Sequence, residues 1–361
     1  MTVGTSHRVV VTGHGGPDVL RWTSTERPTA GDGEVVVEVH AAGVSAFDLI
    51  YRRWSRLPGR PAEPFPLGED VVGEVVEVGG GVSGVEVGEL VAAATLSIGV
   101  GGGYAEHVRL RATEVVPVPP GVDPAAAVCV VINHLTAHHH LHVLGRARSG
   151  ERLLVHGAAG GVGSATVQLA ELAGLDVIGT ASGDRVEAVR SLGAMPIDRR
   201  TEDVVRRVRE LTGDGVDLVI DPVGGAAQLW RSYRCLNRRG RLVWLGSAAV
   251  GEQGLRAAPL SMAMLAALRL VPDRRRIPWC PTTDTHAERR PGWYRRTLRE
   301  LLDLVATGRL EPVIAARLPL ADASRAHELL ESGGHFGKFV LVTDAYRPPR
   351  AAATATGGTT T

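Results

Sequence analysis

Polar and apolar residues alternate through the N-terminal third of the chain. Between His7 and about Val118 this alternation is interrupted by glycine and proline, and it is clearest in Glu34–Val39 and Gly73–Gly79. A period of two places successive side chains on opposite faces of a β-strand. The pattern therefore predicts a largely antiparallel β domain over this part of the chain.

The pattern changes at about Asn133. Short apolar runs now alternate with segments of helical length, and these runs cover residues 153–156, 177–180, 216–220 and 242–245. Runs without polar alternation are typical of parallel strands that helices cover on both faces. We therefore expect a second domain of the α/β class. A last strand is predicted at residues 339–342.

Residues 251–296 follow neither pattern clearly. They contain an apolar, helix-like run over 260–270 and then a polar, proline-bearing segment over 272–291, so we expect a variable insertion here. Helical spacing returns over Leu298–Val305. The last residues, Ala345–Thr361, have almost nothing to bury and are predicted to be a disordered tail.

Length and charge limit the class of protein. The 361 residues are enough for two hydrophobic cores, and 44% hydrophobic with 22% charged residues is the composition of a soluble globular protein. A net charge of +1 attracts neither nucleic acid nor an anionic membrane surface. No run approaches the roughly 20 apolar residues of a membrane span. We therefore expect a small-molecule partner, no nucleic acid and no membrane span.

The start of the chain and its cysteines indicate the compartment. The N-terminal residues carry no apolar leader. Cys129, Cys235 and Cys280 are odd in number and lack the paired spacing of a disulfide framework or a zinc lobe. These features favour a reducing, cytoplasmic setting.

A glycine-rich turn follows the first strand of the second domain. The strand over 153–156 runs into Gly-Ala-Ala-Gly-Gly-Val-Gly at 157–163, and an amphipathic helix comes next. Strand, glycine turn and helix together are the context of a dinucleotide-binding motif, in which free amides at the helix N-terminus bind pyrophosphate. The alternative is an ordinary tight turn, which needs fewer glycines. The predicted cofactor-binding residues here are Ala159, Gly160, Gly161, Val162 and Gly163.

The end of the second strand indicates which nicotinamide cofactor binds. Residues 179–182 contain no acidic residue to accept the adenosine ribose hydroxyls. Thr180 lies at this strand end, and Ser182, Arg185 and Arg199 are placed to meet a 2′-phosphate, which favours NADPH over NADH. Asp184 is the competing ribose ligand, and it is equally suited to cap the helix that begins at Arg185.

Motifs along the chain resemble those of one enzyme superfamily. The chain is similar to the medium-chain dehydrogenases/reductases, and most closely to their quinone oxidoreductase branch, which includes vesicle amine transport protein 1-like members. The resemblance covers nearly the whole chain except about 251–291 and the tail. It is carried by His40–Ser45 with Asp48–Leu49, Pro66–Glu69, Gly73–Gly79, Gly102–His107, Leu135–Ala137, the glycine turn, Asp221–Gly225 and Gly337–Val340.

The resemblance implies a fold with two domains and a homodimer. Residues 1–130, completed by 275–344, would form a GroES-like β-rich substrate domain. Residues 131–274 would form a Rossmann domain with a doubly wound parallel sheet that binds NADPH, and 345–361 would be the tail.

The resemblance also shows which residues stand at the positions of the zinc ligands. Zinc-dependent members bind catalytic zinc through cysteine and histidine at places that hold Ser45, Glu69 and Ile132 in this sequence. This is no thiolate or imidazole set, and the four-cysteine structural zinc lobe is missing as well. The resemblance therefore implies a reductase that works without a metal.

Further site residues come from the same resemblance. Asn133 and Thr136 would lie against the nicotinamide half of the cofactor, although both also cap helices well. Ser45 and Tyr51 would face the substrate and are the candidate catalytic residues. Many quinone oxidoreductases have asparagine where Ser45 stands, and Tyr51 is equally suited to packing. Additional cofactor contacts are implied for Gly224, Gly246 and Lys338.

A histidine cluster and an arginine cluster each have a candidate binding role and an ordinary surface role as the alternative. His134, His138 and His142 recur every four residues, as a metal-binding helix face requires, but no carboxylate or cysteine partner lies near them in sequence. Arg274–Arg276 would suit the phosphate of a pantetheine arm or would be solvated surface.

The combined expectation is an NADPH-dependent reductase. Hydride would pass to a quinone or to the C=C bond of an α,β-unsaturated carbonyl, which the protein positions in a dry cleft. The alternatives are a carrier-protein or CoA-linked enoyl reductase, and a non-catalytic NADPH-binding regulatory or membrane-surface protein. Fold alone does not separate these functions.

Overall fold

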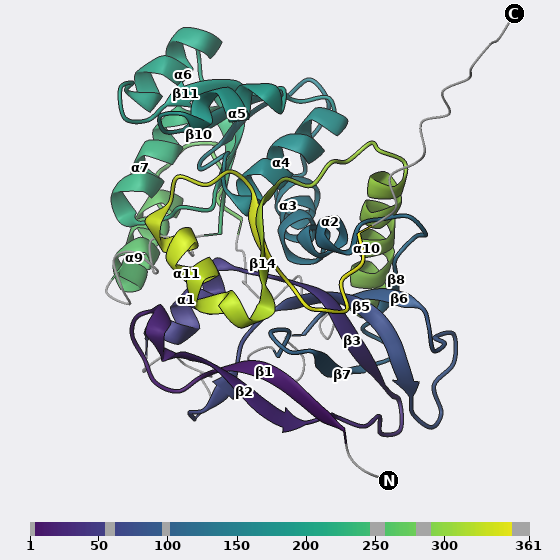
Figure 1. The fold of residues 1–361 in the computed structure, drawn as a ribbon. Helices are drawn as coiled ribbons and strands as arrows, with labels where there is room; N and C mark the ends of the chain where they lie inside the picture. The colour runs from purple at the N-terminus through teal and green to yellow at the C-terminus, as the bar shows by residue number, and fades with distance from the viewer. Residues whose placement is uncertain (1–3, 55–61, 96–101, 246–256, 279–289, 349–361) are drawn as a thin grey trace, which may run out of the picture.

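The computed structural model describes residues 4–54, 62–95, 102–245, 257–278 and 290–348. Figure 1 shows an antiparallel β-rich domain in its lower half and a parallel sheet flanked by helices in its upper half. This arrangement confirms the predicted α/β class, with a β-rich domain and a second domain built on a parallel sheet.

The β-rich domain combines the start of the chain with its end. Its main sheet has the order β14-β15-β3-β5-β6-β8, with β7 also pairing with β3, and a second sheet has the order β2-β1-β4. Helix α1 follows β3, and α11 connects β14 to β15. The bounds are β1 Thr5–Val11, β2 Leu20–Glu26, β3 Glu34–Gly43, α1 Ala46–Arg53, β4 Phe65–Pro66, β5 Asp70–Val78, β6 Leu90–Ala94, β7 His107–Arg111, β8 Val116–Pro117, β14 Ile314–Pro319, α11 Ala323–Ser332 and β15 Lys338–Val342.

The Rossmann domain has five parallel strands in the order β11-β10-β9-β12-β13. The first strand in sequence, β9, lies in the centre, so the chain winds outward from it in both directions. The bounds are β9 Arg152–Val155, α4 Gly161–Leu172, β10 Asp176–Ala181, α5 Arg185–Ser191, β11 Met195–Asp198, α6 Val204–Thr212, β12 Val216–Asp221, α7 Ala226–Cys235, β13 Leu236–Trp244 and α9 Ala257–Arg269.

Successive residues of β9 enter different hydrophobic cores. Leu153 and Val155 pack with α4 and the interdomain helices, whereas Leu154 packs with the residues of α6, α7 and α9 on the other face. Burial on both faces explains why the sequence of this strand is an uninterrupted apolar run.

A helical segment joins the two domains. Figure 1 shows α2 and α3 between the two sheets, with α10 beside them. The core that includes Ala41 and Val72 of the β domain continues through this segment to β9. The bounds are α2 Pro124–Cys129, the π-helical turn η3 Val130–His134, α3 Leu135–His138, the π-helical turn η4 His139–Leu144, and α10 Pro291–Ala306.

The C-terminal tail begins later than the sequence predicts. The composition places residues 345–348 in the disordered tail, but Tyr346 packs against the interdomain core and its hydroxyl donates to Asp123 Oδ1 at 2.9 Å. The prediction is wrong for these residues because a single aromatic side chain provides burial that an average over the tail hides. Residues 349–361 lie outside the described residues.

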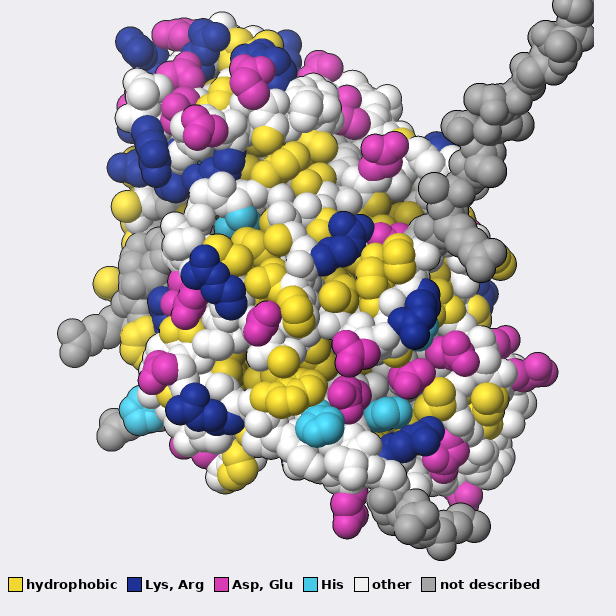
Figure 2. All heavy atoms as spheres, viewed as in Figure 1, with side chains coloured by type: hydrophobic (Ala, Val, Ile, Leu, Met, Phe, Trp, Pro, Cys, Tyr) yellow, Lys and Arg dark blue, Asp and Glu magenta, His cyan; other side chains and the backbone are white. Residues whose placement is uncertain are grey.

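Charged side chains of both signs lie interspersed on the face shown in Figure 2. Within the described ranges, none of the helices has the length and apolar character required to cross a membrane.

Candidate active site

Two adjoining cavities open at the carboxyl ends of the parallel strands. The first, called here the arginine cavity, measures about 440 Å³ and is lined by Gly160, Thr180, Ser182, Arg185 and Arg199, among others. The second, called the interdomain cavity, measures about 530 Å³ and is lined from both domains, by Ser45, Glu69 and Phe339 on one side and Asn133, Thr136 and Val162 on the other. Gly157, Gly160, Arg185, Arg199 and Val223 line both. A crevice at the point where the strand order reverses is where ligands bind in this class of sheet.

The glycine turn has the geometry of a pyrophosphate site. Gly160 is the N-cap of α4, and the first turn of a helix leaves its amides without intrahelical acceptors. A Cβ at Gly160 would meet only the Gly157 carbonyl oxygen, at 3.4 Å, so the protein itself leaves this side open. A Cβ at Gly163 would lie 2.1 Å from the same oxygen, and one at Gly161 would lie 2.3 Å from Asn133 Nδ2. Gly163 therefore allows the helix to pack close to the turn, and Gly160 leaves room for a ligand.

The end of β10 brings together the residues predicted to bind the 2′-phosphate. Arg199 Nε donates to Ser182 Oγ at 2.7 Å, and Arg185 Nε donates to the Ser182 carbonyl oxygen at 3.4 Å. All three line the arginine cavity. Burial, followed by the charges of Arg199 and Arg200, lowers the pKa of Arg185. Positive charges that repel one another in this way favour the binding of an anion.

Asp184 and Gly224 do not reach either cavity. Asp184 occupies the N-cap position of α5 without a side-chain capping bond, and it is absent from both linings. The amides of Gly224 and Val223 donate to Asp221 Oδ1 at 3.0 Å, so the Asp-Pro-Val-Gly-Gly motif forms a turn. Gly246, another predicted cofactor contact, falls outside the described residues.

The interdomain helices supply one wall of the interdomain cavity. Asn133 and Thr136 both line it and are only 7% and 9% exposed. The Thr136 carbonyl oxygen lies 2.6 Å from His140 Nδ1, and the π-helical turns place His139 and His140 in the same wall. The sequence pattern drew attention to His134, His138 and His142, but it is His139 and His140 that reach the cavity.

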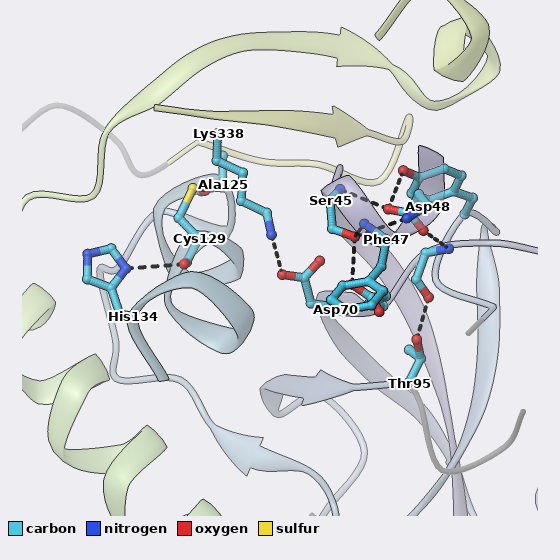
Figure 3. A network of polar contacts seen from close by, with 12 residues as sticks. Ser45, Phe47, Asp48, Asp70, Thr95, Ala125, Cys129, His134 and Lys338 are labelled. Carbon is cyan, nitrogen blue, oxygen red and sulfur yellow. Dashed lines mark hydrogen bonds and ion pairs between the residues drawn. The ribbon is translucent and has the colours of Figure 1, made fainter. Parts of the chain in front are cut away.

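A buried ion pair lies behind the cavity. Lys338, the only lysine of the chain, donates from Nζ to Asp70 Oδ2 at 2.6 Å, and the two side chains are 1% and 0% exposed. A Cβ at Gly43 would lie 2.1 Å from Lys338 Cε, so glycine at this position of β3 makes room for the pair. Figure 3 shows Lys338 pointing toward Asp70. Lys338 lines the cavity, but its ammonium group is bound to Asp70 rather than left for the predicted cofactor contact.

Ser45 and Glu69 meet at the floor of the interdomain cavity. Ser45 Oγ donates to Glu69 Oε2 at 2.6 Å and accepts from the amides of Phe47 and Asp48 at the start of α1. Ser45 is thus the N-cap of α1, in a reciprocal capping box with Asp48. The single hydroxyl hydrogen of Ser45 is donated in the hydrogen bond to Glu69. Figure 3 shows Ser45, Phe47 and Asp48 clustered beside Asp70.

Burial sets the protonation of the acids in this region. Burial, and after it the charge of Asp48, raises the pKa of Glu69 to about 8, against the opposing effect of the Ser45 hydrogen bond. Burial also raises the pKa of Asp48 to about 6, although hydrogen bonds from the Ser45 amide, the Tyr104 hydroxyl and the Gly68 amide oppose it. Of the two acids, Glu69 has the higher pKa and is the one that burial favours in the protonated form.

Tyr51 lies beside this cluster rather than in the cavity lining. Its ring is half-buried against the core of the β domain, and it is not among the described residues that line the interdomain cavity. Burial, followed by the charges of Glu69 and Asp48, raises the pKa of its phenol. Both facts make Tyr51 a weaker proton donor than its place in the sequence implied.

The three residues at the zinc-ligand places come together in space. Ser45, Glu69 and Ile132 all line the interdomain cavity. Over the described ranges, no group of three or more His, Cys, Asp or Glu side chains is arranged to hold a metal ion.

The histidine face predicted from the four-residue period is broken. His138 and His142 have ring centroids 4.7 Å apart, but His134 Nδ1 turns to the Cys129 carbonyl oxygen at 3.2 Å. The π-helical turns at either end of α3 disrupt the period, because each π turn contains more residues than an α turn.

The arginine run lies at the other end of the sheet. Arg274–Arg276 line a surface pocket with Arg146, Arg148 and Glu151, which precede β9. The carboxyl end of β9 carries the glycine turn, so the run is separated from the cleft by the length of the sheet.

Comparisons with known proteins give the same family at the level of domains and of the whole chain. The profile of the alcohol dehydrogenase GroES-like domain matches residues 31–120, and that of a zinc-binding dehydrogenase domain matches 192–341. A quinone oxidoreductase of Pseudomonas aeruginosa is 34% identical over 340 residues, which are 93% of this chain and 99% of that protein.

Two further relatives widen the range of chemistry. A phenolphthiocerol/phthiocerol polyketide synthase of Mycobacterium tuberculosis is 33% identical over 90% of this chain, and the matched part is only 14% of the length of that protein. A mycobacterial protein solved in complex with NADPH is 32% identical, with a TM-score of 0.81 over 93% of this chain and 99% of that chain. With the fold and the cleft described above, these matches show that the chain belongs to the medium-chain dehydrogenase/reductase superfamily, in its quinone oxidoreductase branch.

Proposed function

We propose that the protein is an NADPH-dependent, zinc-independent reductase that transfers hydride to a quinone or to the C=C bond of an α,β-unsaturated carbonyl. The observation that carries this proposal is the pair of adjoining cavities. One has a glycine turn and arginines suited to a phosphorylated dinucleotide, and the other lies between the domains with Phe47, Ile132 and Phe339 in its lining. The quinone oxidoreductase and the NADPH-bound relative support the same interpretation.

The residues present fit the cofactor. The amides at the start of α4 and the open side of Gly160 would hold the pyrophosphate, and Ser182, Arg185 and Arg199 would hold the 2′-phosphate. Asn133 and Thr136 would face the nicotinamide. When bound, NADPH supplies the hydride. The chain itself orients the substrate, excludes water and provides donors for the oxygen that gains charge.

We propose a zinc-independent reaction because the residues at the zinc-ligand positions do not suit the metal. Ile132 has no ligating atom, and the Ser45 hydroxyl is already shared between two amides and Glu69. Glu69 is then the one carboxyl group of the three, and a catalytic zinc site in a protein has three protein ligands drawn from Cys, His, Asp and Glu.

The test is NADPH consumption by the purified protein against quinones, enones and acyl thioesters, with and without a chelator. We expect oxidation of NADPH with at least one quinone or enone, and no change on chelation. Binding of NADPH without consumption in any of these reactions would overturn the proposal in favour of a non-catalytic NADPH-binding protein. Loss of turnover on chelation that zinc restores would overturn its metal-free part.

A carrier-bound or CoA-linked enoyl substrate is the second candidate, and the match to the polyketide synthase favours it. The position of Arg274–Arg276, away from the cleft, gives it no support from a phosphate-binding handle. A kcat/KM for an enoyl thioester at least tenfold above that for the matching free enone would establish it.

A further inference from the structure

The proton that completes the reduction needs a source in the interdomain cavity. The sequence points to Ser45 and Tyr51, but the hydroxyl hydrogen of Ser45 is engaged by Glu69 and Tyr51 is not part of the lining. Lys338, which also lines the cavity, is held by Asp70. Two carboxyl groups belong to the described lining, Glu69 and Glu331. Glu331 is paired with Arg52, and Glu69 is the one in contact with Ser45.

The geometry of Glu69 suits a proton donor. The residue is only 5% exposed, yet it lines the cavity. Oε2 accepts from Ser45 Oγ at 2.6 Å, and among the described residues this is the one side-chain hydrogen bond of the carboxyl group. The nearby ammonium group of Lys338 is taken by Asp70, at 2.6 Å. A carboxyl group in such a site holds its proton until a stronger base arrives.

We propose that Glu69 is the acid that protonates the reduced substrate and that Ser45 is its positioning residue. This inference rests on the proposed reductase function and names a catalytic residue for it. Glu69 stands at a position that binds zinc in the metal-dependent members of the superfamily. In this protein the residue at that position would donate a proton, and no Lewis acid would be involved.

The protonation step conserves atoms and electrons. The β-carbon of the enone gains a hydride with its electron pair, and the C=C electrons move to the carbonyl oxygen as an enolate. The Glu69 O–H bond breaks, its proton forms the new C–H bond at the α-carbon, and the carboxylate regains a proton from water. NADPH, one proton and the enone thus give NADP⁺ and the saturated ketone. For a quinone, the same proton would go to the oxyanion.

The charged and titratable groups around Glu69 favour this assignment. Asp48 and Tyr51 face it from α1, Asp70 from β5, Lys338 from β15 and Tyr104 from the segment before β7. Asp70 and Lys338 neutralise each other, and three hydrogen bonds to Asp48 favour its ionised form against the effect of burial. The residual negative charge keeps the proton on Glu69 and supports its raised pKa.

The first experiment uses the cofactor-free protein and no activity. Infrared difference spectra between the parent and Glu69→Gln at pH 7 should contain the carbonyl band of one protonated carboxyl group, which disappears as the pH is raised through about 8. Glu74→Gln, on the same strand β5 and outside the cavity lining, is the matched control and should leave that band in place. No such band at pH 7 would overturn the proposal.

The second experiment follows turnover against pH. Glu69→Gln should lower kcat by about a hundredfold or more while NADPH affinity stays within about twofold, and the parent rate should fall as the pH rises through the Glu69 pKa. Glu69→Gln turning over like Glu74→Gln would refute the role of Glu69. A parent protein that reduces nothing, but still has the infrared band, would refute the proposed function instead.

Ser45 is tested by the position of the pH midpoint. Its hydrogen bond lowers the pKa of Glu69, so Ser45→Ala should move the falling limb of the profile to higher pH. Ser45→Thr keeps a hydroxyl and should keep the parent midpoint. A lower rate in Ser45→Ala with an unmoved midpoint would mean that Ser45 acts only as the cap of α1 and would overturn its positioning role.

Discussion

The arginine cavity and the interdomain cavity adjoin each other, yet they are built from different kinds of sequence. The first takes its glycine turn, strand end and arginines from one stretch, residues 156–234, and its lining presents backbone amides and arginine side chains. The second collects Ser45, Glu69, Asn133 and Lys338 from four distant places and buries them. Changes in the first should therefore alter cofactor binding, whereas changes in the second should alter stability and proton transfer.

The largest effect is expected from breaking the buried pair behind the interdomain cavity. Lys338→Met leaves Asp70 as an uncompensated buried charge and should cost about 3–5 kcal/mol of unfolding free energy. The double variant Asp70→Asn/Lys338→Met should recover most of this loss, because no buried charge remains. Urea unfolding measures both, and a Lys338→Met protein within about 1 kcal/mol of the parent would contradict the comparison.

The glycine turn should respond in binding and not in folding. Gly160→Val should weaken NADPH binding by about a hundredfold or more, since its side chain occupies the space left for pyrophosphate, while thermal unfolding shifts little. Gly163→Val is the contrasting variant, because its Cβ would lie 2.1 Å from the Gly157 carbonyl oxygen and the fold itself should suffer. Fluorescence titration with NADPH, together with thermal unfolding, distinguishes the two variants. Normal NADPH affinity in a folded Gly160→Val protein would refute the assignment of a pyrophosphate site to this turn.

Glu69 should make the stability of the parent depend on pH. Its pKa is raised from 4.5 to about 8, so the folded state keeps a proton that the unfolded chain has released, and stability falls as the pH rises through this window. The side chain introduced by Glu69→Gln does not titrate. The unfolding free energy of this variant relative to the parent should therefore rise by up to about 1.4 kcal/mol per pH unit between about pH 5 and pH 8. Denaturant unfolding at about pH 5.5 and pH 8 measures this gain; equal differences between the two proteins at both values would show that Glu69 is ionised throughout.

The smallest effect is expected at the exposed arginines. Arg199→Ala should reduce the preference for NADPH over NADH by about tenfold, because one of the two arginines near Ser182 remains. Arg190→Ala, on the exposed side of α5 and paired with Glu187, is the matched control and should change neither affinity. An unchanged preference in Arg199→Ala would direct attention to Arg200 and His335.

Individual residues explain where prediction from the sequence succeeded. Residues 153–163 carry strand, turn and helix in one run, and the structure has β9, the turn and α4 there. Ser182, Arg185 and Arg199 lie together, as expected, because strand ends of a parallel sheet meet at one edge. Strand β11 at Met195–Asp198 was not predicted, since four residues with a proline give no clear period.

The interdomain cavity could be predicted only in part. The resemblance singles out Ser45, but it gives Glu69 only as a missing zinc ligand and Lys338 only as a cofactor contact. An Asp after Glu69 and a single lysine in the chain were the available signals for a buried pair. Neither shows which carboxyl group the lysine binds.

The sequence by itself determined the two domains, the position of the glycine turn and the residues at the zinc-ligand places, because periodicity, glycine geometry and residue identity are local properties. Only the tertiary structure decided that Ser45 donates a hydrogen bond to Glu69, that Lys338 pairs with Asp70, and that Tyr51 lies outside the cavity lining. These outcomes depend on burial and on distances of a few ångströms between residues far apart in the chain, and both are set by packing.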